Sequence, residues 1–356
     1  MRHFRLAPTL LVCLAGLLGS CSRDAAPSES AVASPIAAAD SLAPPVVQTL
    51  AAAANASPLP AAPALSRPPL HDAAARGDLT AVAAQLAAGQ PVDALDASGW
   101  TPLMHAAHNG RGEVVTALLA RGADAKRADA KGATAILRAA ENGDAGIIRQ
   151  IVAVGADPNV ASPEGWTPLM AAAWEGNTAA ADALLAAGAK VDQPDQKGVT
   201  ALVRAAGNGH LETVQLLLAR GANPNAADHA GISALITASL KGHTDVVEAL
   251  IAAGAQVNAK STEGWTALMA AAGEGETITA ARLLARGADV NATRNDGWTP
   301  LMVAAFDDHA GTAAVLLASG ADREAKNADG DTALAIAEDW DNGDTVELLM
   351  SSPKAP

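Results

Sequence analysis

Apolar and polar positions alternate along residues 66–350 in a pattern that predicts pairs of short helices. The first apolar segment of a pair follows a Thr, as in PLMHAAH at 102–108, and a Gly comes shortly after it. The second segment, such as LETVQLLLA at 211–219, has apolar residues three and four apart, which is the spacing of one helix face. A Gly-Ala pair and Asn- or Asp-rich residues then precede the next Thr. The pattern therefore predicts helix–turn–helix units separated by turns.

These predicted units all have the same length. A turn glycine recurs every 33 residues, at Gly99, Gly132, Gly165, Gly198, Gly231, Gly264, Gly297 and Gly330. The Gly-Ala pair recurs at the same interval from Gly122 to Gly320. A fixed period of this size is typical of a stacked array, in which no unit buries its apolar faces alone. We count nine units, starting at residues 66, 99, 132, 165, 198, 231, 264, 297 and 330, of which the first and last are degenerate caps.

Short motifs indicate where the helices begin and end. GWTPLM occurs at 99–104, 165–170 and 297–302, and GWTALM occurs at 264–269. The Thr is suited to N-capping the first helix, and Pro follows at a position where its missing N–H costs nothing. Glycines such as Gly110 and Gly143 supply the left-handed residue that ends this helix. Asp308 and Asp341 replace that glycine in the last two units, so we expect the C-terminal end of the array to be less stable.

The unit G-x-T-[PA]-L-x-x-A-A-x-x-G, with its apolar second helix and Asn- or Asp-rich turn, closely resembles the ankyrin repeat. The resemblance covers residues 66 to about 350, and it implies an all-α solenoid of helix–turn–helix units with projecting β-hairpin loops. One position departs from the family, which usually has His after T-P-L. Only His71 keeps this His, and apolar residues stand at the equivalent position of the other units.

Aromatic residues are few, but most of them stand at positions that line the concave binding face in ankyrin proteins. The chain has six Trp and two Phe, and four of the Trp directly follow a turn glycine. The resemblance assigns protein binding to Trp100, Trp166, Trp174, Trp265, Trp298 and Phe306. Exposed aromatic side chains give a large contact area at low entropic cost, so we expect the four Trp that follow a glycine to be largely exposed on one side. The alternative is that each Trp packs on the neighbouring unit and braces its hairpin.

The N-terminus has the pattern of a bacterial lipoprotein signal. Arg2 and Arg5 give a positive start, and the apolar run at 6–18 is too short to span a bilayer as a mature helix. The run ends in LGSC, which resembles a lipobox and implies cleavage before Cys21 and acylation of Cys21. A plain secretory signal that contains a Cys is the alternative. Ser22, in place of Asp, favours the outer membrane over the inner membrane.

The segment after the expected signal peptide (1–20) is rich in Ala, Pro and Ser and has no apolar periodicity. It cannot bury enough surface to offset the entropy of ordering, so we expect 21–65 to be a disordered tether behind the acylated cysteine. We also expect a flexible tail at 351–356. Cys13 lies within the signal peptide, so the mature chain would hold no free thiol and no disulfide, which suits an oxidising compartment.

Charge and motifs exclude several classes of function. The formal net charge of −14 argues against sequence-independent nucleic-acid binding, which needs a basic face. His105 and His108 lie one helical turn apart and could hold a metal, but Arg or Ala fills the row of His105 in other units, which favours tolerated variation. DWDNGD at 339–344 resembles a calcium loop, yet its glycine comes one place early and Met350 stands where the loop needs Glu. We expect no metal, no cofactor and no catalytic residue.

These patterns favour a noncatalytic scaffold that is anchored through Cys21 and binds one or more proteins in the bacterial cell envelope, at the outer membrane and facing the periplasm. The alternative is an accessory or inhibitory protein that shields a periplasmic enzyme. An oxidative-stress enzyme is suggested, because some bacterial periplasmic ankyrin proteins are associated with such enzymes. A third alternative, an enzyme or metalloprotein, would be revealed by stoichiometric metal or by hydrolysis of generic substrates.

Overall fold

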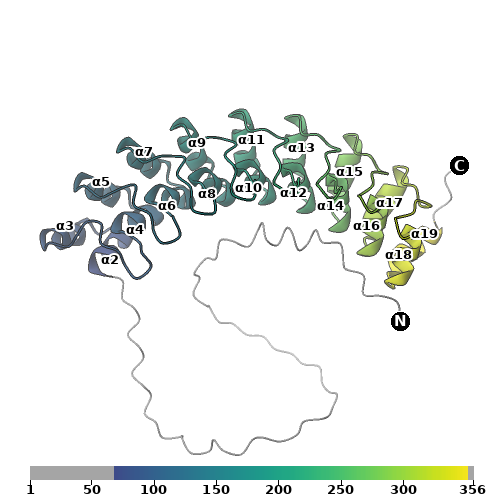
Figure 1. The fold of residues 1–356 in the computed structure, drawn as a ribbon, viewed down its shortest axis with the longest axis horizontal. Helices are drawn as coiled ribbons and strands as arrows, with labels where there is room; N and C mark the ends of the chain where they lie inside the picture. The colour runs from purple at the N-terminus through teal and green to yellow at the C-terminus, as the bar shows by residue number, and fades with distance from the viewer. Residues whose placement is uncertain (1–67, 352–356) are drawn as a thin grey trace, which may run out of the picture. The chain divides into compact units, whose positions relative to one another are not determined.

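The protein folds into a stack of helix pairs. A computed structural model describes residues 68–351, and these residues form eighteen helices in nine consecutive pairs, without a β-strand (Figure 1). The expected all-α repeat fold is confirmed. The expected signal peptide (1–20), the tether (21–65) and residues 352–356 of the expected tail lie outside the described residues. The last helix extends to Ser351.

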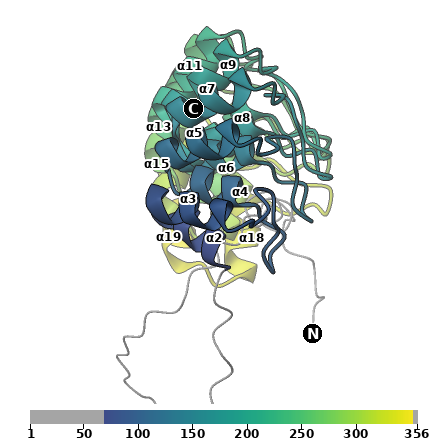
Figure 2. The same ribbon diagram turned by 90° about the vertical axis from the view of Figure 1, so that its left-hand side faces the viewer.

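The first helices of the pairs lie side by side in an inner row, and the second helices form an outer row (Figure 1). The inner helices are α2 (Pro69–Arg76), α4 (Pro102–His108), α6 (Ala135–Asn142), α8 (Pro168–Glu175), α10 (Ala201–Gly207), α12 (Ala234–Leu240), α14 (Ala267–Gly273), α16 (Pro300–Phe306) and α18 (Ala333–Asp339). The outer helices are α3 (Leu79–Ala87), α5 (Gly112–Ala120), α7 (Ala145–Ala153), α9 (Thr178–Ala186), α11 (Leu211–Ala219), α13 (Thr244–Ala252), α15 (Thr277–Ala285), α17 (Ala310–Ala318) and α19 (Gly343–Ser351). The connecting loops extend together to one side of both rows (Figure 2).

The loops are tight turns with little strand pairing. In the first complete loop, the amide of Asp96 donates to the carbonyl of Trp100 at 3.0 Å, and equivalent bonds close the other loops. Only two isolated β-bridges occur among the described residues, between Ala128 and Thr134 and between Ala227 and Ser233. The loops therefore project as expected, but their pairing is shorter than the expected β-hairpins. Between residues 68 and 351, no helix has the length and hydropathy needed to span a membrane.

Helix ends follow the local signals. The hydroxyl of Thr101 accepts a hydrogen bond from the Met104 amide at 3.2 Å, which caps α4 directly before Pro102. At the other end, the glycines expected to be left-handed all have positive φ. Asp308 and Asp341 are also left-handed, with φ of 57° and 60°, and they are the non-glycine residues of the described part with positive φ.

The core between the two rows is apolar and made of small or branched residues. Leu103, Met104 and Leu118 illustrate it, because each is at most 1% exposed. Apolar residues thus fill the position where the family usually has His, as expected. The one His that is kept, His71, is buried and bonds through Nε2 to the carbonyl of Ala94 at 2.9 Å.

Polar side chains at the start of the outer helices join each unit to the one before it. Carbonyls at the end of an inner helix have no partner within the helix. The His210 ring nitrogen Nε2 lies 2.9 Å from the Trp174 carbonyl, and Asn342 Nδ2 donates to the Phe306 carbonyl at 2.8 Å. Contacts of this kind link neighbours only, so stability is expected to come from stacking between consecutive units.

Candidate protein-binding face

Seven of the eight described loops are held by a short polar side chain three residues before the turn glycine. In the first complete loop, Asp96 Oδ1 accepts hydrogen bonds from the amides of Ser98 and Trp100, at 2.8 and 2.9 Å. The same pair of bonds is accepted by Asp129, Ser162, Asp195, Asp228, Ser261 and Asn327. This turn fixes the backbone of the residue that follows the glycine, which is Trp100, Trp166 or Trp265 in three of these loops. In the remaining loop, the equivalent residue is Arg294.

The second carboxylate oxygen of three of these Asp residues contacts an Arg or His side chain nine residues later. Asp129 Oδ2 accepts from Arg138 at 2.9 Å, and Asp195 Oδ2 accepts from Arg204 at 2.8 Å. Asp96 Oδ2 lies 2.7 Å from Nε2 of His105 in the same arrangement. The units that use Ser in the loop have Ala nine residues later, at Ala171 and Ala270. The array therefore uses two alternative residue pairs: a loop carboxylate with an Arg or His on the inner helix, or a loop hydroxyl with an Ala on the inner helix.

Asp228 belongs to neither kind of pair, because no Arg, His or Ala stands nine residues after it. Nine residues later stands Thr237, whose hydroxyl donates to the carbonyl of Ser233 at 3.0 Å. Burial raises the pKa of Asp228, hydrogen bonds from the amides of Ile232 and Ala230 oppose the rise, and the nearby charge of Asp195 adds to it. The carboxylate of Asp228 is thus held less favourably than that of Asp195 in the preceding unit.

Five of the six Trp rings lie under an arginine. The guanidinium carbon of Arg138 is 4.1 Å from the centroid of Trp100. Arg204 lies 4.9 Å from Trp166 and 5.7 Å from Trp174, and Arg294 lies 4.5 Å from Trp265 and 5.8 Å from Trp298. Most of these arginines come from the unit that follows the Trp. A guanidinium over an aromatic face is attracted by the ring quadrupole, so these contacts brace neighbouring units against each other.

The expectation that the four Trp after a glycine are largely exposed is wrong. Trp265 is only 3% exposed, and the other three Trp are partly buried. Trp174 and Phe306, at the ends of α8 and α16, are also partly buried. The physical reason for these five Trp is the arginine that lies over each ring, whereas Phe306 packs against Trp298 and Trp340. The alternative that a Trp braces its hairpin describes Trp265 well, whereas the others keep part of their surface open to a partner.

The predicted aromatic residues gather in separate clusters. Trp166 and Trp174 meet edge to face, with centroids 6.3 Å apart. Trp298 meets Phe306 at 5.7 Å, and Phe306 meets Trp340 at 4.7 Å, so the second cluster includes Trp340, which was not among the predicted binding residues. Trp265 touches neither cluster through a ring contact within the described residues.

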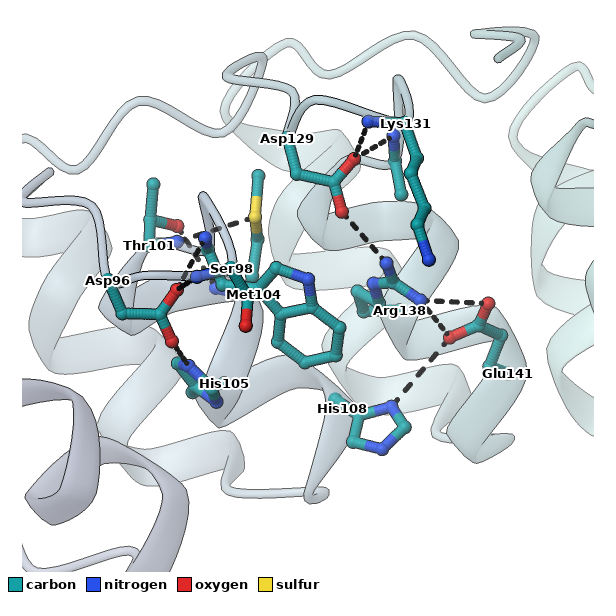
Figure 3. A network of polar contacts seen from close by, with 12 residues as sticks. Asp96, Ser98, Thr101, Met104, His105, His108, Asp129, Lys131, Arg138 and Glu141 are labelled. Carbon is teal, nitrogen blue, oxygen red and sulfur yellow. Dashed lines mark hydrogen bonds and ion pairs between the residues drawn. The ribbon is translucent and has the colours of Figure 1, made fainter. Parts of the chain in front are cut away.

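A polar network that includes Asp96, His105, Arg138 and Glu141 lies towards the N-terminal end of the array (Figure 3). The Trp100 ring contacts it through Arg138 and His105. Arg138 donates to both Asp129 and Glu141, and Nδ1 of His108 lies 3.7 Å from Glu141. Burial alone would raise the pKa of Glu141, but His108 and Arg138 outweigh it, and the pKa is lowered. The pKa of Asp96 is likewise lowered, because hydrogen bonds from His105 and two backbone amides outweigh the effect of burial.

The two histidines considered as metal ligands are held by acidic partners. His105 faces Asp96 and His108 faces Glu141, so the rings point to different carboxylates (Figure 3). Across residues 68–351, no group of three or more His, Cys, Asp or Glu is arranged to hold a metal ion. In the 339–344 run, Asn342 Nδ2 donates to the carbonyl of Ala305 at 2.8 Å, which is the inter-unit contact of the other repeats.

Sequence reasoning missed the arginines. Arg138 and Arg204 were interpreted as tolerated variation in the row of His105, although each stands nine residues after an Asp and 38 residues after a Trp. Both spacings recur at Trp100 and Trp166, and together they would have indicated a repeated contact between units. Arg294 carries no such signal, because it occupies the loop position that is Asp, Ser or Asn elsewhere.

Stacked helix pairs with loops on one side define a repeat solenoid of the kind that serves as an interaction scaffold. The chain belongs to the ankyrin-repeat family, because the family model of three ankyrin repeats matches residues 36–129, 70–162, 136–228, 221–294 and 277–355. The crystal structure of the human ASB11 ankyrin repeat domain is similar, with a TM-score of 0.57 and 27% identity. The match covers 62% of this chain and 99% of that chain. No curated protein matches this chain.

Proposed function

We propose that this protein is a lipid-anchored ankyrin scaffold of the bacterial cell envelope that binds one or more proteins through the loops and inner helices of its array. Membership of the ankyrin family supports an interaction scaffold, since such arrays typically present a surface and no catalytic centre. The partly buried aromatic residues carry the proposal. Trp166 and Trp174 form an accessible pair on adjoining elements, and aromatic residues of this kind dominate the binding energy of protein interfaces.

The anchor is supported by the sequence alone. The apolar run that ends in LGSC at 18–21 is the motif of acylated bacterial proteins, and more than one acyl chain gives stable membrane attachment. Cys21→Ser should abolish labelling by a fatty-acid probe and move the protein out of the membrane fraction. Ser20→Ala is the matched control, since it keeps a small residue before the cysteine. Unchanged labelling of Cys21→Ser would refute the anchor and leave the scaffold function standing.

Partner capture tests the scaffold function. The full-length protein, carrying an affinity tag and cross-linked in the envelope, should recover specific proteins that mass spectrometry identifies. Trp174→Ala should lower the affinity for such a partner by about tenfold or more, as interface aromatics typically do. Ile278→Ala is the control, because Ile278 lies on the outer helix α15 and is 72% exposed. Equal losses in both variants, or none in either, would contradict binding on the inner helices.

A further inference from the structure

Trp340 is the most exposed aromatic residue of the array. It follows α18 directly and is 52% exposed. Its ring meets Phe306 edge to face, at 4.7 Å and 64°, and Phe306 in turn meets Trp298. The cluster of Trp298, Phe306 and Trp340, which we name the terminal aromatic cluster, therefore holds the Trp340 ring in place while leaving much of it open to solvent.

Trp340 also differs from the other five Trp in what lies over its ring. All six Trp fall within the described residues, and each of the other five has an arginine guanidinium 4.1–5.8 Å from its ring centroid. For Trp100 and Trp166 the arginine belongs to the inner helix of the next unit. Trp340 belongs to the last described helix pair, and within residues 68–351 no arginine covers it.

Acidic residues adjoin the terminal aromatic cluster in the sequence. Asp339 and Asp341 flank Trp340, Asp307 follows Phe306, and all three are exposed. Among the described residues, none of the three forms a salt bridge with a base. Desolvation raises the pKa of Asp307, and Glu274 adds to the rise against the opposing effect of His309. These carboxylates would be stabilised by a cation brought to the terminal aromatic cluster.

The charge of the whole region points the same way. Residues 263–351 contain sixteen acidic and five basic residues, whereas residues 68–262 contain nineteen acidic and fourteen basic residues. The net charge is therefore −11 in the shorter C-terminal part and −5 in the longer part before it. A surface with this potential attracts basic partners and repels acidic ones.

We propose that the terminal aromatic cluster binds an arginine side chain in a basic segment of a partner protein, with the guanidinium over Trp340 and its N–H groups directed to Asp339 and Asp341. The proposal rests on the scaffold function and names the chemistry of the partner at this end of the array. Arg204 provides the model within the chain, because its guanidinium lies over Trp166 and donates to Asp195 at once. A planar guanidinium serves both contacts, while a Lys ammonium is a more strongly hydrated point charge.

Indole N–H signals in the NMR spectrum of the full-length protein provide a direct test. With Trp labelled by ¹⁵N, six indole signals are expected, and Trp340→Phe identifies that of Trp340. The probe is a short blocked peptide with two Arg residues in a Gly-Ser background. We expect the Trp340 signal to shift first and to saturate. A peptide in which neutral citrulline replaces Arg keeps the shape without the charge, and it should shift the signal little.

Variants define the contribution of each contact. Trp340→Ala should weaken binding of the Arg peptide by about fivefold, in the range of cation–π contacts at exposed sites. The double variant Asp339→Asn with Asp341→Asn should also bind the Arg peptide more weakly. Its loss of affinity should be larger at low salt than at high salt, because salt screens exposed charges. Glu324→Gln is the matched control, since this exposed acid lies in the preceding loop. A citrulline peptide that binds equally well, or an unmoved Trp340 signal at saturating Arg peptide, would overturn the proposal.

Three further outcomes separate this inference from others. If Lys354→Gln alone shifts the Trp340 signal as the Arg peptide does in the parent protein, then the chain's own tail is the occupant and the proposal is wrong. If Trp340→Ala captures envelope partners as well as the parent protein does and the Arg peptide leaves the Trp340 signal unmoved, the scaffold function stands without this contact. If no partner is captured by any variant while the Arg peptide still binds, the scaffold function fails and the site remains.

Discussion

Trp166 and Trp340 show how differently one residue type is used in two regions of the same array. Trp166 follows a turn glycine, lies under Arg204 and is partly buried, and Arg204 is itself bonded to Asp195. Trp340 lies at the end of the last inner helix, has acids on either side and is 52% exposed. The difference arises from the neighbouring unit, which supplies a cation in the first case. The position in the repeat and the neighbouring unit together therefore decide whether an aromatic side chain braces the array or stays open to a partner.

The largest loss of stability is expected from breaking the ion pair between Arg204, which lies over Trp166, and Asp195. Arg204→Met leaves the Asp195 carboxylate, whose side chain is only 6% exposed, without its cation. Removing one member of a buried pair typically costs 3–5 kcal/mol, so we expect the free energy of unfolding in urea to fall by about 3 kcal/mol. The double variant Asp195→Ser with Arg204→Ala copies the Ser162 and Ala171 set and should recover most of the loss. A double variant as unstable as the single one would contradict this account.

Substitution of the aromatic residues themselves should separate the two uses. Trp265→Ala empties a buried site and should lower the free energy of unfolding by about 3 kcal/mol, as large-to-small core substitutions do. Trp340→Ala should change it by less than about 0.5 kcal/mol, because the side chain is exposed. Chemical denaturation of both variants measures the difference. Similar losses would mean that Trp340 is also a structural brace.

The pH dependence of stability should distinguish Asp96 from Asp228. The folded pKa of Asp96 is below its ordinary value of 3.8, so its ionised form stabilises the fold above that value and the benefit is lost as pH falls through the folded pKa. The folded pKa of Asp228 is raised, so its ionisation becomes a penalty as pH rises from 3.8 through the folded pKa. At pH 7, Asp96→Asn should lower the melting temperature and Asp228→Asn should raise it.

Melting temperatures between about pH 3 and pH 7 test these opposite signs. Both differences from the parent protein should shrink towards the acidic end, because Asp228 is protonated below its raised pKa and the benefit of ionised Asp96 is lost as pH falls through its lowered pKa. Asn327 shows that an amide can hold this turn, because its Oδ1 accepts from the amides of Asp329 and Asp331. Shifts of the same sign in the two variants would refute the assignment of the buried carboxylates.

The smallest effects concern the two left-handed aspartates. Asp341→Gly relieves the strained backbone and should raise the free energy of unfolding by a few tenths to about 1 kcal/mol. Asp308→Gly should gain less, because Asp308 Oδ1 accepts a hydrogen bond from the Thr345 amide of the next unit at 3.1 Å. In Asp341→Gly, the backbone amides of α19 should exchange hydrogen more slowly than in the parent protein. Exchange in α19 already as slow as in α11 would argue against a weak C-terminal end.

The sequence predicted the fold in detail because the repeat enforces it. The 33-residue period, the Thr before most inner helices and the glycines after most of them describe contacts within one unit, which short motifs encode directly. The candidate site was harder to predict, because the cover of a ring such as Trp166 is supplied by Arg204 in the next unit. The exposure of Trp340 was hard to predict for the same reason, because it results from the lack of a covering arginine in the described units.

The placement of Trp and Arg in different units also has an evolutionary consequence. Trp100 and Arg138 recur 66 residues later as Trp166 and Arg204, so this contact repeats with a period of two units over residues 99–230. Deletion of residues 132–164 would set Trp100 opposite Ala171, whereas deletion of 132–197 would set it opposite Arg204 and keep Asp129 in register. Recombination that changes the length of such an array is therefore tolerated best in steps of two repeats, and duplication in the same steps copies the complete contact.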